Sequence, residues 1–355
     1  MTRSRTFRSI RRTLALAVVP VLALSACGND SSNSSSDTTD ASDLSGTTIT
    51  VYSGRSEELV APFFEEFTAT TGIKVNARYG DSGEMAALLL TEGSASPADV
   101  FFSQDAGALG AVEDAELFAP LTISEIEQVD PAYRSTAGGW TGVSGRVRVF
   151  VYNPELVPNP PTTIDELLDP RWSGKIGFAP TNASWQSFVT GLRVLRGEDA
   201  AREWLEGFKA NDPQEFEKNG LVRDAVNDGT VSLGLVNHYY LYEKIRTEGE
   251  DAVVAKNQYV SAGDPGGLIN VAGVGILGSS KKKAAAEALV KYMLSEDGQN
   301  YFSEKTFEYP LVSGIEAWVN LPALTTLQPP AIDLSDLKSI EETQDLLADV
   351  GLLTK

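Results

Sequence analysis

Cysteine and histidine are almost absent from this chain of 355 residues, which has one of each, Cys27 and His238. A single cysteine excludes disulfides within the chain and a structural zinc site built from several thiolates. A Ser-His-Asp triad would need His238, and no Gly-x-Ser-x-Gly motif accompanies it. We therefore expect no enzyme, although a lipid-anchored hydrolase that uses a pair of carboxylates is an alternative that residue counting leaves open.

Positive charge is also scarce, because 29 lysines and arginines face 49 aspartates and glutamates, for a net charge of −20. Five of the arginines lie in the first 12 residues, where there is no acid, and without them the net charge is −25. A body this acidic is repelled by phosphate backbones. We expect no nucleic-acid partner.

The start of the chain has the pattern of a secretory signal. Its arginines precede an apolar run, residues 13–26, that is too short to span a bilayer. The run ends in Leu24-Ser25-Ala26-Cys27, which resembles the lipobox of bacterial lipoproteins, whose cysteine is lipidated. We predict a signal peptide over residues 1–27 and anchoring through Cys27 to the outer face of the cytoplasmic membrane. The pair Arg11-Arg12 leaves open whether export is Sec-dependent or twin-arginine.

Residues 28–45 are mostly Ser, Thr, Asp, Asn and Gly, and this composition predicts a disordered tether. Beyond it, short β-rich runs alternate with amphipathic ones, a pattern typical of α/β folds. We predict strands over residues 47–52, 73–79, 98–102, 145–152, 174–178, 230–236, 253–260 and 267–277. We predict helices over residues 57–71, 82–92, 184–195, 199–210, 220–227, 281–294 and 339–350. The run 145–152 is expected to be a long strand that joins two sheets.

The stretch from Val236 to Tyr242 places His238 and three tyrosines at the end of a predicted strand. Ligands of open α/β sheets bind at the carboxyl ends of strands. Two adjacent tyrosines can both reach such a ligand only if the chain turns there, as it does where a strand passes into a helix. Of the neighbours, His238 is expected to pack or to form hydrogen bonds, and Tyr242 to be structural.

Seven motifs resemble those of the ferric-ion-binding proteins of bacterial iron importers. They are residues 52–55, 97–105, 144–149, 172–177, 237–240, 264–267 and 308–311. The resemblance implies a two-lobed type II periplasmic-binding fold of the α/β class, with a mixed sheet flanked by helices in each lobe and a ligand cleft between the lobes. We expect lobe 1 to comprise residues 46–147 and 271–320, and lobe 2 to comprise residues 148–270 and 321–355. The resemblance further implies a permease of an ABC importer as partner, and we expect a monomer.

The resemblance also assigns residues to the site. The family's tyrosinate ligands fall on Tyr239 and Tyr240. Its anion-binding segment falls on Thr181, Asn182, Ala183 and Ser184, with Asn219 and Asn237 nearby.

Two positions depart from the family pattern. Ser56 stands where many members have a histidine ligand, and Gln104 stands where they have a glutamate. Branches that lack the histidine compensate with a further tyrosine, but this chain has Trp140 near that place. We interpret Ser56 as the N-cap of a helix that could also bond a ligand, and Gln104 as lining the cleft.

The chemistry of phenols fits a small trivalent cation. A free phenol has a pKa of about 10, and binding ferric iron offsets the cost of removing its proton. Two tyrosinates leave Fe3+ with one uncompensated charge, which an anion such as carbonate, phosphate or citrate can balance. Helix N-termini such as the one predicted near residue 184 attract anions, and either Arg146 or Arg148 is expected to pair with the anion while the other faces solvent.

We therefore predict capture of ferric iron together with a synergistic anion or as a small chelate. The losses at Ser56 and Gln104 keep a second hypothesis open, in which the same fold carries an organic or anionic solute such as a phosphonate or a thiamine-like compound.

Overall fold

The computed structural model describes residues 44–353. The predicted signal peptide, Cys27 and nearly all of the predicted tether lie outside this range. The described strands follow the order β2-β1-β3-β9-β4-β7-β5-β6, and β8 and β10 also pair with β4. They are β1 (Thr48–Ser53), β2 (Lys74–Tyr79), β3 (Val100–Ser103), β4 (Trp140–Tyr152), β5 (Ile176–Phe178), β6 (Gln214–Glu215), β7 (Leu233–Asn237), β8 (Lys256–Gln258), β9 (Ile269–Ile276) and β10 (Tyr309–Pro310).

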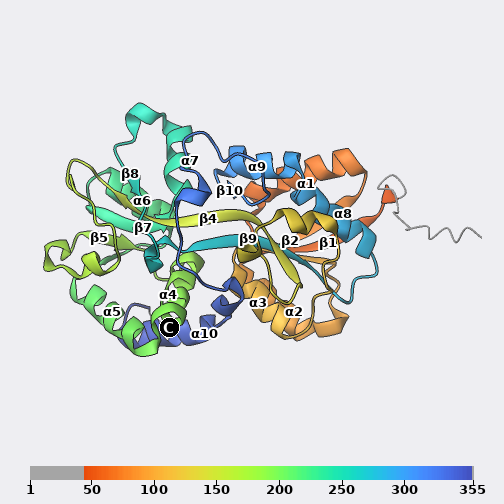
Figure 1. Ribbon diagram of the computed structural model, residues 1–355, viewed down its shortest axis with the longest axis horizontal. Helices are drawn as coiled ribbons and strands as arrows, with labels where there is room; N and C mark the ends of the chain where they lie inside the picture. The colour runs from red at the N-terminus through yellow and green to blue at the C-terminus, as the bar shows by residue number, and fades with distance from the viewer. Residues whose placement is uncertain (1–43, 354–355) are drawn as a thin grey trace, which may run out of the picture. The chain divides into compact units, whose positions relative to one another are not determined.

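Strand β4 belongs to two sheets. From Trp140 to Val147 it pairs with β9, and from Arg148 to Tyr152 it pairs with β7. We call the sheet of β2, β1, β3, β9 and the first part of β4 the first sheet, and the sheet of β7, β5, β6 and the last part of β4 the second sheet. Figure 1 shows β4 running from one group of elements to the other. The predicted strand that joins two sheets is thus confirmed, and it begins five residues earlier than the alternating run 145–152.

Helices cover both faces of the first sheet. They are α1 (Glu57–Thr71), α2 (Ser82–Glu92), α3 (Ala106–Asp114), α8 (Lys283–Met293) and α9 (Glu296–Thr306), with α2 and α3 on the face opposite to α1, α8 and α9 (Figure 1). Helix α1 shows why the sequence folds this way: Val60, Phe63, Phe64 and Phe67 recur at helical spacing and are all buried. It ends at Gly72, whose positive φ of 73° closes the last turn.

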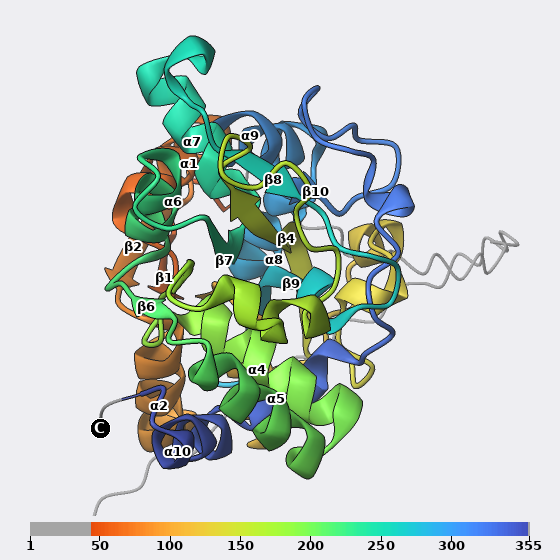
Figure 2. The same cartoon turned by 90° about the vertical axis from the view of Figure 1, so that its left-hand side faces the viewer.

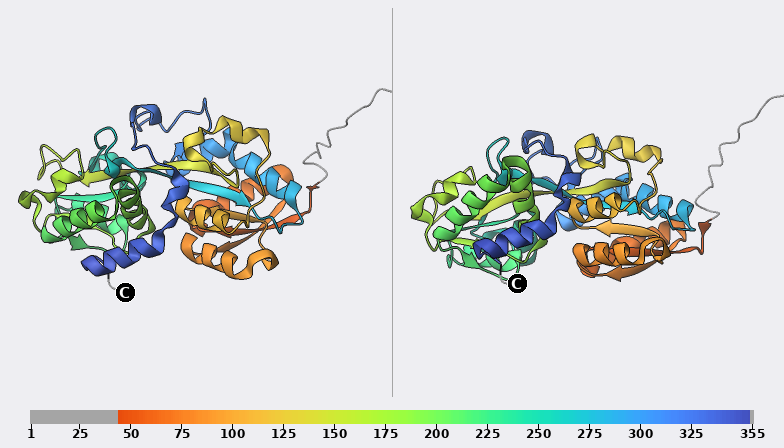
Figure 3. Two further views of the ribbon diagram at one scale, coloured as in Figure 1. Left: turned by 60° about the horizontal axis from the view of Figure 1, so that its bottom comes forward. Right: turned by 90° about the horizontal axis from the view of Figure 1, so that it is seen from below.

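The second sheet has its own helices and its own core. These helices are α4 (Ala183–Arg196), α5 (Glu198–Ala210), α6 (Asn219–Asn227), α7 (Tyr239–Glu248) and α10 (Ile340–Val350). Figures 2 and 3 show α4, α5 and α10 packed together. Their core contains Trp185, Phe188, Trp204 and Phe208, and the last two rings stack 5.2 Å apart.

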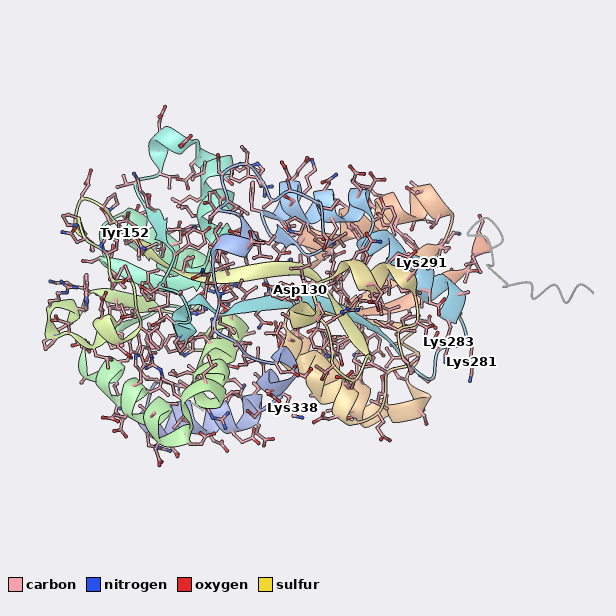
Figure 4. All side chains as sticks on the ribbon, viewed as in Figure 1. Asp130, Tyr152, Lys281, Lys283, Lys291 and Lys338 are labelled. Atoms are coloured by element: carbon pink, nitrogen blue, oxygen red, sulfur yellow. The ribbon has the colours of Figure 1, made fainter. Side chains whose placement is uncertain are left out.

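Labelled side chains of β4 and α8 help to locate the elements of the first sheet and those of the second sheet. In Figure 4, Tyr152 lies among the second-sheet elements, whereas Lys283 and Lys291 of α8 lie among those of the first sheet. Among the described residues no helix is both long and apolar enough to cross a bilayer. The lobe boundaries given above stay a prediction.

Candidate functional site

Two tyrosines stand at the junction of β7 and α7. Strand β7 ends at Asn237, His238 already has helical dihedral angles, and α7 begins at Tyr239. The rings of Tyr239 and Tyr240 stack with their centroids 4.4 Å apart and their planes inclined by 29°. Tyr239 is only 8% exposed and Tyr240 is half-buried. The expected turn from strand to helix is confirmed, and it stacks the two phenol rings on each other.

His238 holds this junction in place. The main-chain N–H of Val147 donates to its Nδ1 at 3.1 Å, so the ring proton is on Nε2, which lies 2.8 Å from the carbonyl oxygen of Phe307. Burial lowers its pKa to about 4, which keeps the ring neutral. Its ring also packs edge-on against Tyr239. The prediction that His238 packs and forms hydrogen bonds is confirmed.

Part of the predicted anion segment caps helix α4. Asn182 is the N-cap, and its Oδ1 accepts from the main-chain N–H of Ser184 at 3.0 Å and from the Ser184 hydroxyl at 2.7 Å. The amide of Asn219, at the start of α6, donates to the same Oδ1 and to Ser184 Oγ. The buried Oδ1 of Asn219 has no partner among residues 44–353. The structure therefore brings Asn182, Ser184 and Asn219 together at a helix N-terminus, where anions bind well.

Arg148 reaches this cluster from β4. Its Nη1 donates to Ser184 Oγ and its Nη2 to the carbonyl of Leu235, both at 3.1 Å. Within the described part of the chain it has no carboxylate partner, and its guanidinium lies over the rings of Trp185 and Phe188. Burial lowers its pKa to about 9, although the nearby Tyr240 opposes that shift. Within residues 44–353, a buried positive charge without a carboxylate partner thus contacts the α4 cap and lies near Tyr240.

A second group of buried charges approaches the tyrosines from the first sheet. Arg55 donates two hydrogen bonds to Glu308, at 2.8 and 3.1 Å, and Ser144 donates a third at 2.7 Å. Burial alone would raise the pKa of Glu308, but Arg55 and Arg146 outweigh it and lower that pKa. Arg146 also acts on Tyr239, whose pKa burial and Tyr240 raise well above its usual value.

Sequence reasoning gave no site role to Arg55 or Glu308. Their positions lie 253 residues apart, so no local pattern pairs them. The one signal was that both fall within motifs that carry the family resemblance. The expectation that either Arg146 or Arg148 faces solvent is wrong, because they are 2% and 3% exposed. The reason is that β4 lies in the middle of the sheet order and is covered on both faces.

The two departures from the family pattern have different surroundings. Ser56 occupies the N-cap position of α1, as interpreted, but it is exposed and its side chain makes no capping hydrogen bond. Gln104 follows β3, is half-buried, and its main-chain N–H bonds to Ser82. Trp140 is the first residue of β4, about 20 Å along the strand from Arg146, and does not replace a ligand beside the tyrosines.

The other predicted site residues have these places. Thr181 is exposed just before the α4 cap, and Ala183 is the first residue of α4. Asn237 is buried at the end of β7, where its backbone pairs with Arg148. Among residues 44–353 no group of three or more His, Cys, Asp or Glu side chains could hold a metal ion. The oxygen atoms that the junction offers are those of the two phenols.

The fold is that of a two-lobed solute-binding protein, and its candidate site contains paired phenols, a capped helix N-terminus and buried guanidinium groups. Residues 95–335 match the family of bacterial extracellular solute-binding proteins, and the chain belongs to that family.

Individual relatives agree with this assignment. The Fe(3+)-binding periplasmic protein of Serratia marcescens is 36% identical over 308 residues, which cover 86% of this chain and 90% of the relative. Iron-bound HitA from Pseudomonas aeruginosa has a TM-score of 0.81 and 34% identity, over 86% of this chain and 99% of that one. The Trichodesmium protein IdiA, or FutA, in complex with iron and citrate has a TM-score of 0.74 and 27% identity, with the same coverage. The predicted two-lobed fold class is confirmed.

Proposed function

We propose that this protein captures ferric iron outside the cytoplasm, together with an anion or as a small chelate, and delivers it to an ABC importer. The observation that carries the proposal is the stacked pair Tyr239 and Tyr240 near Arg148, which is buried and has no carboxylate partner among residues 44–353. Iron-binding relatives of similar length support it. The protein acts as a carrier and not as an enzyme.

Capture begins at the phenols. Ferric iron displaces their protons, because at neutral pH the free energy of binding a phenolate oxygen to a hard trivalent cation exceeds the cost of removing the phenol proton. Two phenolates leave charge on the iron and leave coordination positions open. The anion that fills these positions is oriented by the N-terminus of α4, where Asn182, Ser184 and Asn219 are linked to one another and Arg148 donates to Ser184.

Cys27 anchors the protein to the outer face of the cytoplasmic membrane, and residues 28–45 tether the body to it. The relatives include a periplasmic iron-binding protein, which supports an extracytoplasmic place. The permease of the importer is the membrane partner to which the loaded protein docks.

A different solute is the second candidate, and Ser56 and Gln104 favour it. Exposed Ser56 and the neutral amide Gln104 supply no strong ligand where many family members have a histidine and a glutamate. A carrier of an organic or anionic solute would keep the fold, the anion cluster and the partner.

Uptake of radiolabelled ferric citrate by the source bacterium tests the proposal. A strain that lacks this protein should take up little iron, and the native protein should restore uptake. The double variant Tyr239→Phe/Tyr240→Phe should not restore it, whereas Tyr152→Phe, a half-buried tyrosine of β4, is the matched control. Full uptake with the double variant would show that the phenols do not hold iron.

A further inference from the structure

Glu243 is a carboxylate of α7 that lies one helical turn after the tyrosine pair. It is half-buried, and within residues 44–353 its carboxylate makes no hydrogen bond and no ion pair. The hydrogen bond that the Thr247 hydroxyl donates to this residue goes to its main-chain carbonyl oxygen. Glu248, the other acid of this helix, pairs with Lys244 at 2.8 Å. The carboxylate of Glu243 is therefore available to a ligand.

Helical spacing places Glu243 on the same face of α7 as the two tyrosines. Successive residues of an α-helix are rotated by about 100°, so Glu243 lies about 40° from Tyr239 and about 60° from Tyr240, between the two. A helical side chain leans toward the N-terminus and covers the preceding turn, which here carries both phenols. Tyr242 leaves the helix on another face, where it packs against Trp318. One face of α7 thus carries two phenols and a carboxylate.

Charged neighbours connect Glu243 with the same site, but none of those in the described part of the chain pairs with it. They are Arg223, Glu308, Arg246 and Arg55. Arg55 also acts on both phenols, yet its hydrogen bonds go to Glu308. Arg223 pairs with Asp224 instead. Burial and the charge of Glu308 raise the pKa of Glu243 to about 6, and the three arginines oppose that shift.

The charge of the metal matches this arrangement. Ferric iron on two phenolates still carries one positive charge and has open coordination positions. Hard cations take oxygen ligands, and a carboxylate supplies both an oxygen and the missing negative charge. Glu308 acts on Tyr239 but is already engaged by Arg55 and Ser144. Glu243 has no such commitment among the described residues.

We propose that Glu243 is a third protein ligand of the ferric iron, which it binds through a carboxylate oxygen beside the phenolates of Tyr239 and Tyr240. This inference rests on the proposed function. Iron binding releases one proton from each phenol, and the three negative charges on α7 then neutralise Fe3+. A divalent ion at the same three oxygens would leave a buried negative charge, so Glu243 also favours the trivalent state.

The variant Glu243→Gln tests the inference, because it keeps the size of the side chain and removes its charge. In a titration with ferric citrate we expect the affinity to fall by at least about tenfold, the loss that even supporting residues of metal sites cause. We also expect the tyrosinate-to-iron band to move to longer wavelength, because iron with one anionic ligand fewer accepts charge from phenolate at lower energy. Glu248→Gln, on the same helix, is the matched control and should leave both unchanged.

A Glu243→Gln protein with the affinity and the band position of the native protein would overturn the inference. A loss of affinity without movement of the band would also contradict it, because that result indicates a structural role. A native protein that develops no tyrosinate-to-iron band would instead refute the proposed function.

Glu243→Asp keeps the charge, draws the carboxylate back by one methylene and serves if Glu243→Gln does not fold. We expect weaker iron binding and a band displaced to longer wavelength, because the shorter side chain holds the oxygen away from the metal. An unchanged affinity together with an unchanged band would contradict the inference.

Discussion

In the proposed function, the role of the Tyr239 phenol depends on its burial. Burial and the neighbouring Tyr240 raise the pKa of Tyr239, so without metal the phenol keeps its proton. Tyr239 therefore presents no fixed negative charge to divalent ions. A cation must be acidic enough to displace the protons, which favours ferric iron.

His238 makes the stability of the protein depend on pH. Its pKa falls from 6.5 to about 4 in the folded state, because burial disfavours the charged ring. A group with a lowered pKa stabilises the fold fully above pH 6.5, and this contribution is lost as the pH falls toward 4. We expect a loss of about 3 kcal/mol in the free energy of unfolding over that range.

The same histidine provides the measurement. Since the chain has one histidine, its imidazole gives a single set of nitrogen resonances in NMR spectra. These should report a neutral ring with the proton on Nε2 at pH 6. A ring that titrates near pH 6.5 would contradict the described burial.

Glu308 keeps two guanidinium groups compensated. Replacing it by Gln removes the charge that Arg55 and Arg146 face. Breaking a buried ion pair from one side costs about 3 to 5 kcal/mol, which urea unfolding would measure. Glu198→Gln is the control, because Glu198 pairs with Arg193 but is 62% exposed and should cost less than about 1 kcal/mol. Similar losses for both variants would argue against a buried network.

At the scale of elements, helix α4 has a structural cap at Asn182, to which the proposed function adds a binding role. Asn182→Ala removes the side chain that accepts from Ser184 N–H, and we expect a loss of about 1 kcal/mol in stability. It should also weaken iron binding, since the anion cluster loses its centre. Ser295→Ala removes the cap of α9, which accepts from Gly298, and serves as the control. It should lower stability by about as much as Asn182→Ala does and leave iron affinity unchanged. If both variants bound iron with equal affinity, the α4 cap would have no part in iron binding.

Elements with strong local signals are predictable from the sequence. Helices α1 and α2 begin and end at the predicted residues, because Gly72 ends α1 and Asp81 with Glu84 forms a capping box on α2. Helix α9 (Glu296–Thr306) was not predicted, because its sequence is polar on average and its local start signal, the Ser295 cap, is a weak one. The run 253–260 forms only the three-residue strand β8, which pairs with the end of β4.

The candidate site also has features that the sequence predicts and features that it does not. The tyrosine pair follows a predicted strand and the α4 cap opens a predicted helix, so the local sequence and the resemblance both point to them. The pairing of Arg55 with Glu308 joins two distant segments, and no sequence period encodes it. The burial of both Arg146 and Arg148 follows from the packing of β4 between β9 and β7.

At the scale of the whole molecule, β4 links two groups of elements that both contribute to the site. Arg55 and Glu308 come from one group and Tyr239 and Tyr240 from the other, so a ligand bound as proposed would be held from both sides. We expect the lobes to close on binding by a change within the connecting strands. Small-angle X-ray scattering should show a smaller radius of gyration with ferric citrate than without it. Identical scattering curves would contradict closure.

The most direct test of ferric capture by the tyrosine pair is a visible absorbance titration of the native protein with ferric citrate. A tyrosinate-to-iron band should appear and saturate at about one equivalent of iron. It should weaken in Tyr239→Phe and in Tyr240→Phe and vanish in the double variant, while Tyr152→Phe keeps it. A protein that stays colourless, or a double variant that keeps the band, would contradict the account.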